Sequence, residues 1–571
     1  MPPSMILGPD GNPLNTTKRA DAIRSRNRAL SGGGNRSWNG PYDAASLTDQ
    51  HFENWQPYLG SVDSENVYRD RITARVRDLV RNDGWAAGAV TRILDSAIGA
   101  HLRPIPNPDY HYLALVTGNK AFDHTWAREF SKAIDAHWQS WAETDTGLYC
   151  DVHRLNNFTQ MMALAFRHLL VDGDAIARLR WLPKRIGMGK ARFATCVEGI
   201  DPDRLSNPQL RFDNETMRGG VEVDADGVAK AYYIREAHAG DWWAAAKALT
   251  WTRVERETSW SRPIIIHAFE PNRFYQHRGV GGIFLPILQR IKMLAKYDST
   301  ELDSAIINSI FAAYIQSPFD KDLVADALDD DEHLDFYQES RGEFHKDSKI
   351  VLGNARIPLL FPGEEIKSVS ANRPATNFAG FESAVMNNCS SALGISAAQF
   401  SNDFSKVNYS SSRSAMLEAH KTLHRRLKDF CVRMPNPIRN AFLEELFETE
   451  DLPLPKGAPS FIEFRGAYAK ARWCGPPRGW IDPVAEVQGD QMKCEAGFTT
   501  LRDVCAEQGQ DFEEVLEQRA YEINKFKELG IPAPEWTNVD AAKEAQAKTV
   551  TADAAMDAAN AKDEGEKSDG N

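Results

Sequence analysis

A chain of 571 residues exceeds the length at which one hydrophobic core stops growing, so about two to four lobes are expected. With 42% hydrophobic and 26% charged residues it has an ordinary globular composition, and no apolar run reaches the roughly eighteen residues of a membrane span. The net charge of -13 argues against a tight or sequence-specific DNA binder, whose surface would normally be basic.

The termini and the cysteines indicate where such a chain is made. The amino terminus lacks a charged-then-apolar signal sequence, so we expect a soluble protein that stays in the cytoplasm at least until assembly. Seven cysteines are scattered without a CxxC pair. This pattern favours buried, reduced thiols over zinc ligands or disulfides.

Charge is unevenly distributed along the chain. Residues 18–36 carry six basic residues against one acidic, whereas residues 320–347 carry eleven acidic residues against three basic. Residues 540–571 carry eight acidic residues against four lysines. Residues 1–49, rich in Gly, Pro, Asn, Ser and Arg, are predicted to be a disordered or surface arm, and 540–571 a disordered acidic tail.

Helical patterns dominate the first third of the chain. They cover about 64–81, 85–97, 123–141 and 158–171, and Asn82-Asp83-Gly84 separates the first two. The third carries aromatic residues at helical spacing, which favours core packing over ligand stacking. These aromatic positions are Trp126, Phe130, His137, Trp138 and Trp141.

Short β-type runs follow between Gly173 and His267. In Val221–Val228, Asp226-Gly227 supplies a turn between two strand patterns, which is a hairpin signal. A small barrel or sandwich inserted among helices fits these runs best.

A long helix is then predicted, with Pro286 in its first turn, where a missing N–H does no harm. After the acidic stretch and a β-rich piece, a second helix covers about 377–393 and ends at Gly394, which suits a left-handed cap. The residues up to Ser410 form a cluster of turn formers that is too polar to pack as a core element. The next helix is locally basic, with Arg413, Lys421, Arg425, Arg426 and Lys428.

No segment carries a convincing catalytic or cofactor motif, so neither catalytic residues nor a cofactor are predicted. GMGK at Gly187–Lys190 lacks the spacing of a phosphate loop and is better read as a basic hairpin turn. GVGG at Gly279–Gly282 lacks the context of a dinucleotide site and is predicted to be a tight, flexible joint. The acidic run Asp329–His333 is a weak metal candidate, and His420 with His424 lacks further zinc ligands, so no metal site is predicted.

Four segments in order carry a family resemblance. The string LGIS...FS.D.SKVNYSSSR within Leu393–Arg413 closely resembles the lambda-type family of tailed-bacteriophage portal proteins, and Arg71–Pro104, Arg167–Trp181 and His267–Leu288 agree with it. Tyr275 and His277 depart from the family pattern. The resemblance covers roughly residues 50–530.

The resemblance implies an α+β class, as a mainly helical portal-protein fold with a small β-barrel or sandwich in the wing, long stem helices and a small β-containing clip. It divides the chain into a wing (50–281), stem helix one (282–315), clip (316–375), stem helix two (376–393), tunnel loop (394–410), wing helix (411–434) and helical wing or crown (435–539).

The resemblance also implies the partners. About twelve copies would form a ring at one capsid vertex, and double-stranded DNA would pass through it without its sequence being read. A separate terminase ATPase, the major capsid and scaffold proteins and head-tail connector proteins would bind the ring, and no membrane would be involved. Transient contacts to the DNA backbone would come from Asn402, Ser405, Lys406, Asn408 and Tyr409.

Two groups of charged residues also receive roles from the resemblance. Arg413, Lys421, Arg425, Arg426 and Lys428 would meet either DNA or acidic residues of a neighbouring subunit. Asp329, Asp330, Asp331 and Glu332 would lie in or near the clip and dock terminase or connector proteins. The alternatives are a metal-dependent nucleic-acid hydrolase and a structural capsid or tail subunit without a channel.

Overall fold

The computed structural model describes residues 60–532 apart from 145, 311–313, 317–335, 337–338, 341, 345–348, 353–354, 359–364, 368–377, 406 and 478–482. The predicted arm and acidic tail, and much of the predicted clip, lie outside the described residues. All elements considered below belong to one compact unit that begins at Glu65. Among the described residues, no helix combines the length and the apolar character needed to cross a membrane.

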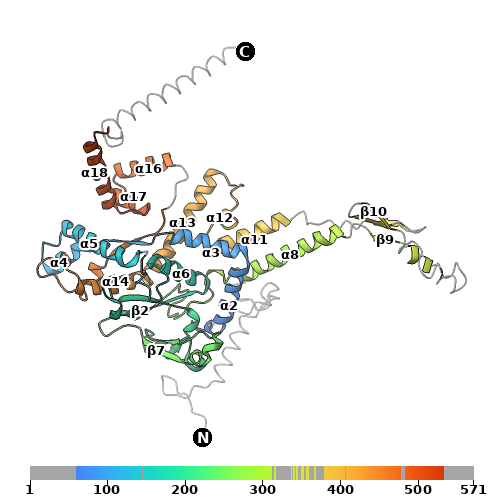
Figure 1. The fold of residues 1–571 in the computed structure, drawn as a ribbon, viewed down its shortest axis with the longest axis horizontal. Coiled ribbons are helices and arrows are strands. Elements are labelled where there is room, and N and C mark those ends of the chain that lie inside the picture. Colours follow the sequence, from blue (N-terminus) through green and yellow to red (C-terminus); the bar gives the residue numbers. More distant parts are fainter. Residues whose placement is uncertain are drawn as a thin grey trace, which may run out of the picture. The chain divides into compact units, whose positions relative to one another are not determined.

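Helices form the larger part of this unit (Figure 1). Up to residue 248 they are α2 (Asn66–Asn82), α3 (Gly84–Ala97), α4 (Tyr110–Thr117), α5 (His124–Ala142), α6 (Phe158–Val171) and the single turn α7 (Ala245–Ala248). The next part of the chain contains α8 (Leu288–Ile310), α11 (Phe378–Leu393), α12 (Ala397–Ser401) and α13 (Tyr409–Arg433). The remaining helices are α14 (Pro435–Thr449), α15 (Arg465–Tyr468), α16 (Pro483–Glu495), α17 (Leu501–Glu507) and α18 (Phe512–Leu529).

The main hydrophobic core is built by amphipathic helices and is rich in aromatic side chains. Trp126, Phe130, Trp138 and Trp141 of α5 are all buried, as the sequence predicts. The Trp141 ring stacks on Phe442 of α14 with their centroids 4.8 Å apart. His137 is only partly buried and meets Phe193 edge-on.

The strands form small antiparallel sheets. The larger two have the orders β3-β2-β8 and β4-β5-β6-β7. Their strands are β2 (Asp174–Trp181), β3 (Thr195–Ile200), β8 (Ile265–Phe269), β4 (Met217–Arg218), β5 (Val221–Val223), β6 (Ala229–Arg235) and β7 (Trp251–Glu255). The smaller pairs are β1 (Arg103–Pro106) with β13 (Ala471–Cys474), β9 (Tyr314–Gln316) with β12 (Glu365–Lys367), and β10 (Lys349–Leu352) with β11 (Ala355–Pro358).

The two larger sheets share one hydrophobic cluster. Ile176, Ile200 and Ile265 from the first sheet pack with Val221 and Tyr232 from the second. Because no hydrogen-bonded ladder joins the two sheets among the described residues, they form an open sandwich and not the closed barrel that the sequence left as an alternative. The predicted hairpin is confirmed, with β5 and β6 joined through Gly227 at φ +79°.

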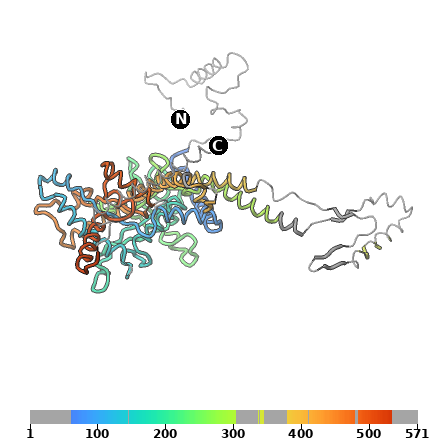
Figure 2. The backbone as a smooth tube through the Cα atoms, turned by 90° about the horizontal axis from the view of Figure 1, so that it is seen from above, coloured from blue at the N-terminus to red at the C-terminus, as the bar shows by residue number. Residues whose placement is uncertain are grey.

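Helices α8 and α11, which cover most of the two predicted stem helices, lie side by side in both views (Figures 1 and 2). Tyr297 of α8 stacks on Phe378 of α11 with their centroids 5.5 Å apart, and it meets Phe381 edge-on. The start of α8 differs from the prediction, because a 3₁₀ turn at Gly282–Phe284 precedes it and Pro286 lies two residues before the helix. Strands β9 to β12 agree with a β-containing excursion between the helices.

All seven cysteines are unpaired, and all but Cys494 are buried. Burial raises the pKa of Cys150 to about 12, because the thiolate would lose its hydration. The prediction of buried, reduced thiols is therefore confirmed for six of the seven.

Candidate nucleic-acid interface and its supporting joint

The end of α11 sets the direction of the polar segment that follows it. Gly394 has φ +75°, and its N–H donates to the carbonyl oxygens of Ser390 (3.0 Å) and Ser391 (3.3 Å). This left-handed cap confirms the prediction made from Leu393-Gly394. A Cβ at Gly394 would lie 2.7 Å from a methyl carbon of Thr422 on α13, so this position also requires a residue without a side chain.

The polar segment between Gly394 and Ser410, which the sequence predicts to be a loop throughout, is a loop only in its second half. Residues 397–401 form α12, which begins with a capping box between Ser396 and Gln399. Phe400 is buried and stacks on Trp85 of α3, with ring centroids 6.1 Å apart. The expectation that the whole segment is too polar to pack in the core was therefore wrong for its first half, where one aromatic side chain fixes the helix.

The chain turns between α12 and α13, and the exposed residues 402–405 and 408 hold the shape of this turn with their own side chains. Asn402 adopts the left-handed conformation (φ 57°) at the end of α12. The Asp403 carboxylate accepts hydrogen bonds from the N–H of Ser405 (2.9 Å) and from its hydroxyl (2.6 Å). Asn408 caps α13 by accepting from the N–H of Ser411 at 2.8 Å. Three of the five predicted DNA-contacting residues thus lie on one turn, namely Asn402, Ser405 and Asn408.

The other two predicted residues are less completely described. Lys406 and the side chain of Tyr409 lie outside the described residues, although the backbone of Tyr409 begins α13. The sequence reading did not select Phe404, whose side chain is 49% exposed on this turn. An aromatic residue between polar turn formers was the signal that could have identified it.

Arg426 forms a hydrogen bond within its own chain. Its guanidinium donates to the carbonyl oxygen of Leu393 at 2.8 Å, which satisfies the end of α11. Its side chain is 13% exposed, and burial lowers the pKa of Arg426. The expectation that it meets DNA or a neighbouring subunit conflicts with this position, because its donors already face its own chain.

The other predicted basic residues of α13 differ in their ion pairs and in their exposure. Arg425 pairs with Glu270 (3.4 Å) and Asp429 (3.3 Å), and Lys421 pairs with Glu418 at 2.6 Å. Lys428 is exposed and has no ion pair within the part of the chain that the structure describes. Arg413 is half-buried and lines a cleft of about 210 Å³ together with His420. His420 and His424 stack on each other, with centroids 5.9 Å apart.

A buried carboxylate ties the β sandwich to the segment that leads into α8. Asp174, the first residue of β2, is 0% exposed. Its Oδ2 accepts from Arg278 (2.8 and 3.0 Å) and from Arg69 of α2 (3.3 Å). Its Oδ1 accepts from the N–H of Gly279 at 2.6 Å and lies 3.0 Å from Nε2 of His267. Two of the segments that carry the sequence resemblance therefore meet at one side chain.

Electrostatics stabilise this carboxylate in its charged form. Burial alone would raise the pKa of Asp174, but Arg278, His267 and Arg69 hold it well below its ordinary value. Burial, with Arg69 nearby, lowers the pKa of Arg278 to about 10, so this guanidinium is still protonated at neutral pH. Arg278 also donates to the carbonyl oxygens of Leu205 (2.6 Å), Gly219 (2.9 Å) and Pro202 (3.0 Å).

The glycines that follow Arg278 allow close backbone packing. A Cβ at Gly279 would overlap the carbonyl oxygen of Gly173, and one at Gly282 would overlap that of Leu170. Gly281 and Gly282 also have positive φ values of 70° and 57°. The segment is a tight joint, as predicted, but its contacts with the end of α6 make it a packed joint and not a flexible one.

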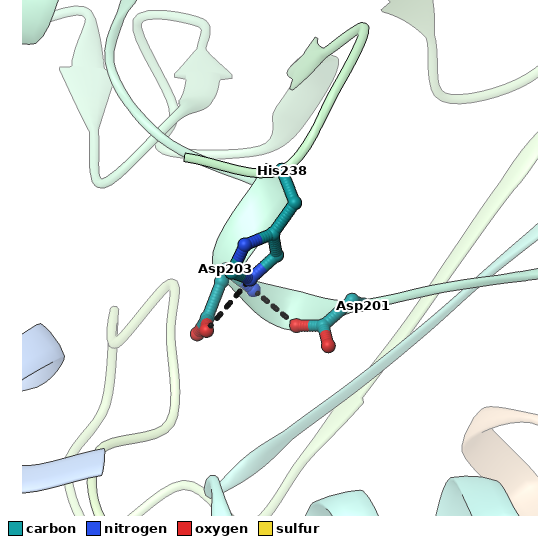
Figure 3. A group of neighbouring side chains, drawn as sticks. All are labelled: Asp201, Asp203 and His238. Carbon is teal, nitrogen blue, oxygen red and sulfur yellow. Dashed lines mark hydrogen bonds and ion pairs between the residues drawn. The ribbon is translucent and has the colours of Figure 1, made fainter. Parts of the chain in front are cut away.

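Three side chains next to this joint have the composition of a metal site. The candidate ligand atoms of Asp201, Asp203 and His238 lie within 4.8 Å of one another, and Figure 3 shows the imidazole between the two carboxylates. Arg77 already donates to Asp203 at 2.6 Å and to Asp201 at 3.2 Å. The guanidinium supplies the positive charge that a metal ion would bring, so this cluster is an ion-pair network within the fold. The other metal candidate, Asp329–His333, lies outside the described residues, as do the predicted docking residues Asp329, Asp330, Asp331 and Glu332.

Comparison with known proteins shows which proteins this chain is similar to. The family model for "Phage portal protein, lambda family" matches residues 48–426. The portal protein of Escherichia phage N15 is 30% identical over 492 residues, which cover 84% of this chain and 89% of that protein. Portal protein B of Escherichia phage lambda is 29% identical over 509 residues, covering 88% of this chain and 92% of that protein. A chain from the virion of a native gene transfer agent particle aligns over 86% of this chain and 99% of its own length, at 13% identity and a TM-score of 0.38.

The family model matches most of the chain, and this match places the chain in a class of phage structural proteins. The chain belongs to the lambda family of phage portal proteins, which are structural components and not enzymes.

Proposed function

We propose that copies of this chain form a closed ring of about twelve at one vertex of a phage capsid, and that double-stranded DNA enters and leaves through the ring. The observation that carries the proposal is the succession of the paired helices α8 and α11, a glycine cap and a turn with residues 402–405 and 408 exposed, in a chain of this family. The ring would assemble in the host cytoplasm before it joins the virion.

We assign the turn at 402–408 to the channel wall. The exposed groups that the structure describes on it are amides, hydroxyls, the Asp403 carboxylate and the half-exposed ring of Phe404, and the one cation in its sequence is Lys406. Every phosphate that a Lys or Arg neutralises adds salt-dependent affinity. A turn of this chemistry can position a duplex and still let it slide.

The partners in this proposal are terminase, the major capsid and scaffold proteins, and head-tail connector proteins. Docking of terminase or connectors is assigned to Asp329, Asp330, Asp331 and Glu332, because acidic residues dominate positions 320–347. Reversing these four charges should weaken terminase-dependent packaging while rings still form. Loss of ring assembly would instead contradict a docking role.

Electron microscopy of the purified chain tests the main proposal. Rings with a central hole, with a mass close to twelve copies, are expected. Compact monomers that cleave nucleic acid only with a metal ion would favour a hydrolase. Oligomers without a hole would favour a capsid or tail subunit without a channel.

The role of the turn is tested by DNA packaging through preformed rings. Replacing Phe404 and Ser405 together by alanine should change the rate of DNA passage without changing the ring. The control is Lys493→Ala, which removes an exposed lysine that pairs with Asp490 on α16. Equal rates of DNA passage for wild type, variant and control would contradict the assignment of the turn to the channel wall.

A further inference from the structure

The connection between β2 and β3 is a basic hairpin that the ring proposal does not use. Pro183–Arg192 contains Lys184, Arg185, Lys190 and Arg192 and no acidic residue. In a chain with a net charge of -13, a stretch of this kind stands out as a local positive patch. This is the segment that the sequence reading identified as a basic turn around GMGK.

Two of the four basic residues anchor the hairpin. Arg185 donates to the carbonyl oxygen of Asp151 at 3.1 Å. Arg192 forms a bidentate pair with Glu450, both N···O distances being 2.7 Å. Within the turn, the N–H of Lys190 donates to the oxygen of Gly187 at 3.0 Å, and Gly189 has φ +68°. The hairpin is therefore held in one shape before any partner arrives.

The exposed side chains at the tip of the hairpin indicate that it binds a partner outside the chain. Met188 is fully exposed at 103%, and Ile186 is 46% exposed. Lys184 and Lys190 are exposed, and neither ammonium group has a hydrogen bond or ion pair within the described residues. Because the backbone of the hairpin is preformed, the conformational entropy lost on binding is confined to the exposed side chains at its tip.

The chemistry of the tip favours a protein over a nucleic acid. Lysines alone would suit a phosphate backbone, but phosphates offer nothing to the fully exposed side chain of Met188. Methionine is an adaptable packing residue that recurs at protein interfaces. The matching surface would present acidic residues around an apolar patch.

We infer that this hairpin docks onto an acidic surface of a second copy of the chain. A ring of identical subunits needs two different complementary faces on each copy, and an acidic chain has few basic patches that could supply one of them. The inference rests on the proposed ring and adds a named contact to it. The hairpin supplies Lys184, Ile186, Met188 and Lys190 to that contact.

Photo-crosslinking in the purified full-length chain tests the contact. Met188 is replaced by p-benzoylphenylalanine, and the assembled sample is irradiated. The expected product is a covalent pair of chains, crosslinked to an acid-rich peptide. Mixing isotope-labelled and unlabelled chains before irradiation shows by mass spectrometry that the two peptides come from different copies.

The outcomes separate this inference from the ring proposal. Rings that give no two-chain product would overturn the hairpin contact and leave the ring intact. A crosslink to added double-stranded DNA in place of protein would also overturn it. If wild-type chains form no ring under any condition, the proposed function fails, and the contact fails with it.

A charge-reversal pair gives a second measurement. Lys184→Glu with Lys190→Glu should raise the protein concentration needed for assembly at low salt by about tenfold, since like charges would then face each other. The matched control is Lys493→Glu with Lys525→Glu, two exposed lysines that pair within their own helices. Equal effects of the two pairs would overturn the contact, because the change would then reflect net charge alone.

Discussion

Both oxygens of the Asp174 carboxylate are occupied by groups from distant parts of the chain. Arg69 comes from α2, His267 from β8, and Arg278 with Gly279 from the segment that leads into the stem. A buried ion pair is not in itself a strong source of stability, but removing one partner leaves an uncompensated charge. Asp174 therefore holds the segment that leads into α8 against the β sandwich.

Replacing Asp174 with asparagine should destabilise the fold and loosen this joint. The substitution leaves two buried guanidinium groups facing a neutral amide, which costs about 3–5 kcal/mol of unfolding free energy. Urea unfolding measures this cost, and hydrogen exchange of residues 278–288 measures the loosening. Glu445→Gln is the matched control, since Glu445 is buried and accepts from the N–H groups of Ala194 (2.6 Å) and Thr195 (2.8 Å). Faster exchange at 278–288 in the control as well would contradict a specific role for Asp174.

The same carboxylate predicts a pH dependence. Its pKa is lower in the folded chain than its ordinary value of 3.8, so the unfolded chain binds the proton more readily. The stabilisation is therefore fully present above about pH 4 and is lost as the pH falls further. The difference in unfolding free energy between wild type and Asp174→Asn should shrink below pH 4. A difference that stays constant down to pH 3 would show that Asp174 is not charged in the folded state.

At the scale of elements, sequence patterns predicted most helices but not the contacts that fix their ends. The predicted helix at 158–171 matches α6 at both ends, and Gly394 caps α11 as expected. The short α12 was missed because its stability comes from burial of Phe400 against Trp85, a residue more than three hundred positions earlier. Periodicity cannot report a contact of that kind.

Prediction of the candidate site from the sequence has the same limit, because long-range contacts leave no local pattern. Its polar residues could be selected from local turn chemistry, and three of them do lie on the exposed turn. The internal role of Arg426 could not be predicted, because its acceptor is the backbone carbonyl of Leu393, thirty-three residues earlier. The Asp174 cluster likewise joins residues about one hundred positions apart, and only folding brings them together.

The cap of α11 gives a prediction at this scale. Gly394→Ala should lower the unfolding free energy by about 1–2 kcal/mol, because a left-handed backbone strains any residue with a Cβ. Contact with Thr422 adds to this cost. Gly380→Ala is the control, since Gly380 lies in the same helix and has open space around its Cα. This control variant should be slightly more stable than the wild type. Equal effects of the two substitutions in urea unfolding would mean that the cap does not matter.

At the scale of the whole molecule, charge contributes more than apolar burial to the contact between α18 and the core. Among the described residues, α16 and α18 contain no buried side chain, and Cys505 is the buried residue of α17. Arg103 bonds Glu514 at 2.8 Å, Arg128 pairs with Glu513 at 3.2 Å, and Lys132 pairs with Glu517. All three cations lie on β1 or α5. Exposed pairs of this kind are weak individually and are screened by salt.

Salt should therefore release α18 before it affects the rest of the chain. At about 1 M NaCl the Debye length falls to about 3 Å, which removes most of the attraction across exposed pairs. Hydrogen exchange should accelerate in α18 and stay unchanged in α5 and α14. Glu514→Gln with Glu517→Gln should reproduce this pattern at low salt, whereas Glu528→Gln, which only loses a pair with Lys525 inside α18, should not. Protection of α18 that is independent of salt would require an apolar contact made with another copy of the chain.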